Sequence, residues 1–222
     1  MTVSRYSPLM QWLKNLASVL VHPRITMRRI LDAPPDRMVW PLVLLATISS
    51  FIGDINISEM SKVYSGLDPK MKIIGPLIPV AVILVTGILF YVSGWIAYGL
   101  GRAMEGTGTV AAVRSALAWG LAPVVWALLY RIPKMWMKPA VELAQAEIGD
   151  FKVAIDAGRL ASGCGTVMLF GILDLLVVVG WVVITSHTLA EAHNFSAARG
   201  FGIVAAVLVA PIVIALAAFL AF

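Results

Sequence analysis

Residues 73–101 read IIGPLIPVAVILVTGILFYVSGWIAYGLG and contain no charged side chain. A membrane-crossing helix needs about 20 mostly apolar residues, so this stretch can span a bilayer and tilt within it. The whole chain has a similar character, because 60% of its 222 residues are hydrophobic, 13% are charged and the mean hydropathy is +0.90. Soluble domains are about 45–50% apolar and about 25% charged. The composition therefore excludes most soluble enzyme folds and nucleic-acid modules, and it predicts an integral membrane protein.

Four further stretches are long and apolar enough to cross a membrane. They are Met38–Ile57, Val110–Tyr130, Cys164–His187 and Gly202–Phe222. We therefore predict an all-α integral membrane protein with five transmembrane helices over residues 38–222. Residues 1–37 form a separate cytoplasmic or interfacial segment.

Basic residues near the ends of the spans predict the orientation of the chain. Six of them precede the first span, and the two sides of the membrane then nearly tie at nine against eight. The first flank usually dominates, and an odd number of spans puts the termini on opposite sides. We predict a bacterial inner-membrane protein with a cytoplasmic N-terminus and a periplasmic C-terminus.

Two segments between the spans have helical periodicity. Residues Pro8–Val21 place Gln11, Lys14, Asn15 and Ser18 on one polar stripe, which is typical of an amphipathic helix lying along the membrane. The loop from Arg131 to Arg159 repeats apolar residues every three or four positions, from Met137 to Ile155. We predict one or two amphipathic helices in this loop, between the third and fourth spans, on the outer surface.

Asp174 is the sharpest polar signal, because it lies near the midpoint of the fourth predicted span. A charge at the bilayer centre costs about 2.5–3.5 kcal/mol on insertion scales. One hypothesis is a proton or ion relay, with Asp54 and Arg114 as companions. The other is a carboxyl group that holds helices together through hydrogen bonds. The sequence leaves both open.

Small residues and prolines indicate how the helices pack. Gly87, Gly94 and Gly101 recur every seven residues and leave one stripe of the second span bare, so that another helix can approach closely. Pro123 and Pro211 each remove a backbone donor, and we predict kinks in the third and fifth spans.

No motif predicts an enzyme, a cofactor or a metal. The single cysteine, Cys164, cannot form an internal disulfide. His187, Glu191 and His193 lie near one another, but their spacing matches no zinc-protease motif. We predict no catalytic residues, no cofactor and no metal site.

The order of three motifs resembles a known family. HPRITMRRIL (His22–Leu31) precedes the spans, GTGTVAAVRSALAWGLAP (Gly106–Pro123) opens the third, and ILD (Ile172–Asp174) leads to LAEAHNFSAARG (Leu189–Gly200). This pattern resembles the bacterial branch of the Yip domain family, whose eukaryotic members are named for interaction with Ypt/Rab GTPases. The resemblance implies five spans, a cytoplasmic N-terminus, association with other membrane proteins and no catalytic residues.

Two functions remain open from the sequence. The first is a non-enzymatic interaction or assembly factor, or an accessory subunit of a membrane protein complex. The alternative is a small transporter, channel or lipid scramblase that uses Asp174. The expected partners are the lipid bilayer and either other membrane proteins or further copies of this chain, and nucleic acid is not among them.

Overall fold

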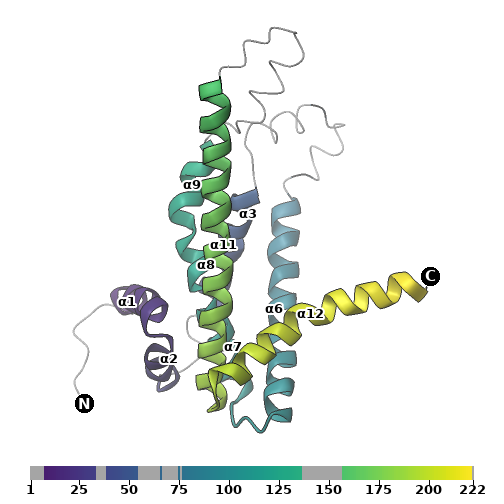
Figure 1. Ribbon diagram of the computed structural model, residues 1–222. Helices are drawn as coiled ribbons and strands as arrows, with labels where there is room; N and C mark the ends of the chain where they lie inside the picture. The colour runs from purple at the N-terminus through teal and green to yellow at the C-terminus, as the bar shows by residue number, and fades with distance from the viewer. Residues whose placement is uncertain are drawn as a thin grey trace.

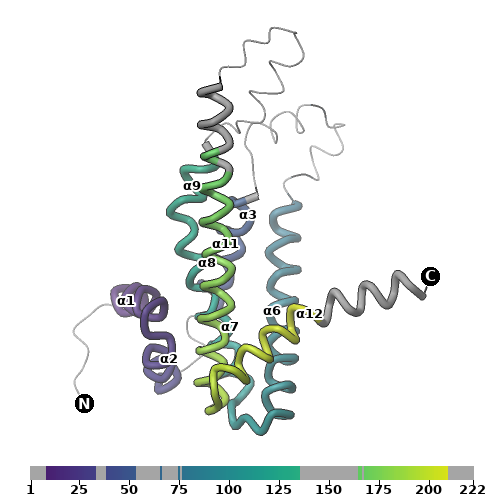
Figure 2. The backbone as a smooth tube through the Cα atoms, in the orientation of Figure 1, coloured from purple at the N-terminus to yellow at the C-terminus, as the bar shows by residue number. Residues whose placement is uncertain are grey.

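Helices make up most of the described structure, which is a computed structural model (Figure 1). It describes residues 8–33, 39–54, 77–136 and 157–221, with Gly66 and Gly75, and side chains are described for most of these (Figure 2). The side chains of Pro8, Asp54, Trp136, Val167 and residues 157–164 and 210–221 lie outside this set. Among the described residues there is no strand, which confirms the all-α class.

Two helices are long and apolar enough to cross a membrane by themselves. They are α6 (Leu77–Ala103) and α11 (Ala157–His193), the latter judged over Met168–His193. A third candidate span is bent by 43° and consists of α7 (Val110–Gly120), α8 (Ala122–Trp126) and α9 (Leu128–Trp136). The described residues thus contain two candidate spans, or three when the bent segment is counted.

The first and last predicted spans are also helical. Helix α3 (Val39–Asp54) and helix α12 (Ala197–Ala221) are apolar, and α12 crosses α6 obliquely (Figure 1). Apolar segments with described side chains cover only Val39–Gly53 of α3 and Ala197–Val209 of α12. Helix α12 continues through Pro211. The predicted helices between Met137 and Ile155 lie outside the described residues.

The bend in the third span lies one turn beyond Pro123. Pro123 is the second residue of α8, a position where a helix needs no backbone donor, so the chain restarts there. The 43° bend comes at Ala127, between α8 and α9. The helix then continues to Trp136, six residues beyond the predicted end of this span at Tyr130.

The amphipathic N-terminal helix is confirmed, because α1 spans Pro8–Val21 as predicted. A second helix, α2 (Pro23–Leu31), folds back on it, and Ser18 and Thr26 share a 2.7 Å hydrogen bond. The pair packs against one side of the bundle (Figure 1). Leu16 and Val19 are buried there. The N-terminal segment is therefore part of the packed structure.

Trp126 fixes α1 to the third span. Its indole nitrogen donates to the Leu16 carbonyl oxygen at 3.2 Å. We expect Trp126→Phe to remove this bond, cost about 1 kcal/mol, and speed hydrogen exchange of the α1 amides. Hydrogen–deuterium exchange on the purified protein measures this effect. The control is Trp40→Phe, whose parent side chain lies over Gly87 on α6. Equal exchange of α1 in both variants would contradict the prediction.

Candidate functional site

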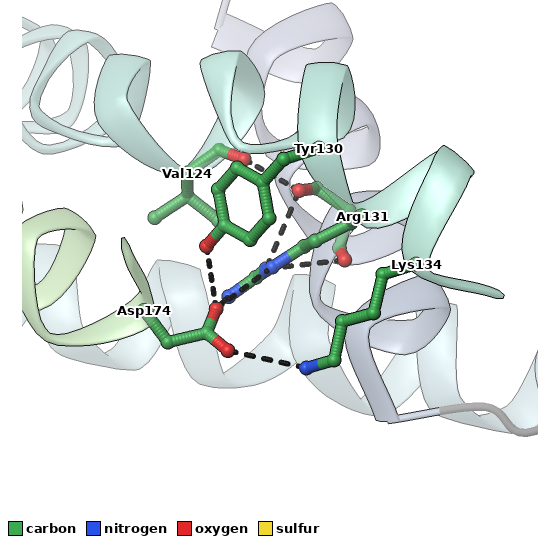
Figure 3. Close-up of polar contacts among 6 residues, drawn as sticks. Val124, Tyr130, Arg131, Lys134 and Asp174 are labelled. Atoms are coloured by element: carbon green, nitrogen blue, oxygen red, sulfur yellow. Dashed lines mark hydrogen bonds and ion pairs between the residues drawn. The ribbon is translucent and has the colours of Figure 1, made fainter. Parts of the chain in front are cut away.

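Asp174 of α11 lies at the centre of a cluster of donors from α9 (Figure 3). Its Oδ1 accepts from the Tyr130 hydroxyl at 2.5 Å and from Arg131 Nη2 at 2.9 Å. Arg131 Nε also reaches Oδ1 at 3.3 Å, and Lys134 Nζ lies 3.3 Å from Oδ2. Both carboxylate oxygens are therefore engaged by side chains of the same helix.

Arg131 extends the cluster to α3. Its Nη1 donates to the Ser49 carbonyl oxygen at 3.1 Å, and the Ser49 hydroxyl in turn donates to the Val124 carbonyl at 2.5 Å (Figure 3). A Cβ atom added to Gly53 would lie only 3.0 Å from Arg131 Nε. The guanidinium thus connects α3, α8, α9 and α11 in one polar network, which we call the Asp174 cluster.

Aromatic rings cover one side of the Asp174 cluster. The Tyr130 and Phe170 rings stack with centroids 6.1 Å apart, and Lys134 Nζ lies 5.6 Å from the Phe170 centroid. The Arg131 side chain is 13% exposed and that of Asp174 is 34% exposed. Such pairing stabilises charges that would otherwise be costly in an apolar surrounding.

Asp174 lies within the apolar part of α11 that has described side chains, which runs from Met168 to His193. The midpoint position of Asp174 in the fourth span stays a prediction.

Sequence reasoning missed all three donors on α9. The sequence predicts a third span that ends at Tyr130, and this prediction places Arg131 and Lys134 in the loop that follows. Their spacing of three residues was the available signal, since it places both side chains on the same face of a continuing helix.

Arg114 does not join the Asp174 cluster. Its guanidinium carbon lies 4.5 Å from the Tyr91 ring centroid and 5.3 Å from that of Trp95, both on α6. The structure therefore does not bring Arg114 to Asp174, because α7 turns this side chain toward α6. The other expected companion, Asp54, ends α3, and its side chain lies outside those described.

The three α6 glycines of the predicted stripe, Gly87, Gly94 and Gly101, are buried, and large side chains of three other helices lie over them. Added Cβ atoms would meet Trp40 at Gly87 and Arg114 at Gly94, and would overlap His193 at Gly101. The bare stripe thus packs inside the chain against α3, α7 and α11.

The histidine-rich end of α11 is used for packing. His193 is 1% exposed and stacks on Phe195, with ring centroids 5.2 Å apart and planes 3° apart. Glu191 pairs instead with Arg28 of α2 at 2.7 Å. Within the described residues no group of three or more His, Cys, Asp or Glu side chains is placed to hold a metal ion.

Comparison with known protein families identifies the family of this chain. A family model, the Yip1 domain, matches residues 17–219. No curated protein and no solved structure matches the chain. The match covers nearly the whole sequence, including the motifs at His22–Leu31, Gly106–Pro123 and Leu189–Gly200. The chain therefore belongs to the Yip1 domain family of membrane proteins.

Proposed function

We propose that the protein is a non-enzymatic, five-span interaction or assembly factor of the bacterial inner membrane, acting as an accessory subunit of a membrane protein complex. Its five spans are α3, α6, the bent segment α7–α9, α11 and α12. The apolar character of α3 and α12 supports counting them with the three candidate spans. The N-terminus lies in the cytoplasm and the C-terminus in the periplasm.

The observation that carries the proposal is the closed geometry of the Asp174 cluster. A proton or ion relay needs a carboxylate that can release its partners, whereas Asp174 binds three side chains of α9, and one of them, Arg131, also binds α3. This arrangement favours a rigid bundle over a transport path. Helices α6 and α11 also have long exposed apolar faces, on which Leu84 is 63% exposed and Leu175 is 61% exposed. These faces contact lipid or the apolar helices of a partner.

The test is purification from native membranes, with a photo-reactive residue in place of Leu84 or Leu175. We expect a stoichiometric membrane protein to co-purify and to crosslink at one of the two faces. The matched control carries the photo-reactive residue at Leu9, which is 66% exposed but lies on α1. A homogeneous particle of this chain alone, together with ion flux in proteoliposomes that Asp174→Asn abolishes, would contradict the proposal and favour transport.

A further inference from the structure

Arg114 is a further cation within a candidate span, and the Asp174 cluster does not use it. It lies four residues after Val110, the first residue of α7, which is about 6 Å along the helix. Its guanidinium rests against Tyr91 and Trp95 rather than against an acid. The side chain is therefore held in place one turn from the end of the span.

Gly94 makes this position possible. A Cβ atom there would lie 2.9 Å from Arg114 Cγ, closer than real Cβ contacts. The aliphatic part of Arg114 thus packs against the α6 backbone at Gly94. Its guanidinium packs against the rings of Tyr91 and Trp95. The three α6 residues form a cradle that fixes the guanidinium.

The cradle itself supplies no acid to pair with Arg114, and the two described acids of α11, Asp174 and Glu191, pair with other cations. Between Val39 and Gly53 on α3, between Leu77 and Gly101 on α6, and over the rest of α7, the sequence contains no Asp or Glu. Arg114 Nε is buried and has no hydrogen-bond partner among the described residues. Aromatic rings interact with the face of a guanidinium, whereas its N–H groups lie at the edge and need acceptors. An unpaired cation inside a span is costly, so an external anion is expected.

We infer that Arg114, held by Gly94, Tyr91 and Trp95, binds the phosphate of a phospholipid headgroup in the leaflet at the N-terminal end of α7. Trp95 is 57% exposed, and exposed Trp and Tyr side chains are typical of the headgroup level of a membrane. Arginine binds phosphate oxygens through paired, charge-assisted hydrogen bonds. The inference concerns lipid binding by this face and does not depend on the proposed function.

The experiment is native mass spectrometry of the delipidated full-length protein with a diacyl phosphatidylglycerol. A diacylglycerol with the same chains but no phosphate is the matched ligand. We expect the wild type to retain one phosphatidylglycerol in preference to diacylglycerol, and Arg114→Met to bind it about tenfold more weakly. The control variant is Arg102→Met, which removes a cation near the end of α6, the helix that carries the cradle. It is expected to bind phosphatidylglycerol like the wild type.

Two further variants keep the inference testable if Arg114→Met does not fold. Gly94→Ala keeps Arg114 but displaces the aliphatic part of its side chain. Arg114→Lys keeps the positive charge but loses the paired hydrogen bonds of the guanidinium. Both variants are expected to bind the lipid less tightly. Equal retention by the wild type and all Arg114 and Gly94 variants would overturn the inference. Displacement of the lipid by inorganic phosphate at the same concentration would assign the site to a free anion. A photo-reactive residue at Trp95 that captures a protein instead of lipid would overturn it as well.

Discussion

Asp174→Leu is expected to lower the free energy of unfolding by about 2–4 kcal/mol, because it leaves two cations without their carboxylate. The loss of the carboxylate destabilises Arg131 more than Lys134, because the Arg131 side chain is 13% exposed and lies between α3 and α11. The partial exposure of Asp174 and Lys134 keeps the effect below that of a fully buried pair. Thermal melting and SDS-induced unfolding in mixed micelles measure the loss.

The Arg28–Glu191 ion pair provides the matched control for Asp174→Leu. The Arg28 side chain is 74% exposed, so solvent screens its pair with the 10% exposed Glu191, and such screened pairs contribute about 0–1 kcal/mol. Glu191→Gln is therefore expected to melt close to the wild type. Adding Arg131→Leu to Asp174→Leu removes the orphaned guanidinium and is expected to recover part of the loss. If Asp174→Leu melts like Glu191→Gln, the Asp174 cluster does not hold the helices together.

Gly101→Ala is expected to destabilise the protein by about 1–3 kcal/mol through overpacking. The new methyl group would overlap the His193 ring, which cannot move aside because Phe195 stacks on its other face and Gly106 lies against its edge. Thermal melting of the purified protein measures the loss. The expected result is a clearly lower melting temperature with an unchanged helical signal.

Gly99 supplies the control two residues earlier on the same helix. A Cβ atom at Gly99 meets nothing within 4 Å, so Gly99→Ala relieves only the conformational cost of glycine. It is expected to leave the stability unchanged or raise it by up to about 1 kcal/mol. Similar losses for both variants would show that the effect comes from α6 itself and not from the contact with His193.

Local patterns in the sequence predicted the helices well where periodicity or hydropathy decides the outcome. The polar stripe predicted helix α1, and the charge-free run through α6 predicted a helix that is long and apolar enough to span a membrane. The bend at Ala127 was not predictable in the same way. Pro123 predicts a kink in the third span. The position of the bend depends on how α8 and α9 pack against α3.

The candidate site was predictable only in part. Asp174 stands out by itself, because a carboxylate in an apolar helix needs an explanation. Its partners depend on the rotation of α9 and on how far that helix continues past Tyr130, and hydropathy specifies neither. Arg114 was also found from the sequence, but its surroundings follow from the absence of a side chain at Gly94 on another helix.

The contacts of α2 set the order in which the chain can be assembled during synthesis. Arg24 donates to the Phe195 carbonyl and Arg28 pairs with Glu191, partners that follow them by 171 and 163 residues. At about 5–20 residues per second, translation takes roughly 8–30 s to reach these partners after α2 has been made. Until the turn between α11 and α12 has been made, the basic N-terminal hairpin lacks these two contacts and can pack only against earlier helices such as α7 and α8. Complete docking of this hairpin therefore requires a chain made at least through Phe195, and a chain terminated before that point leaves Arg24 and Arg28 without these partners.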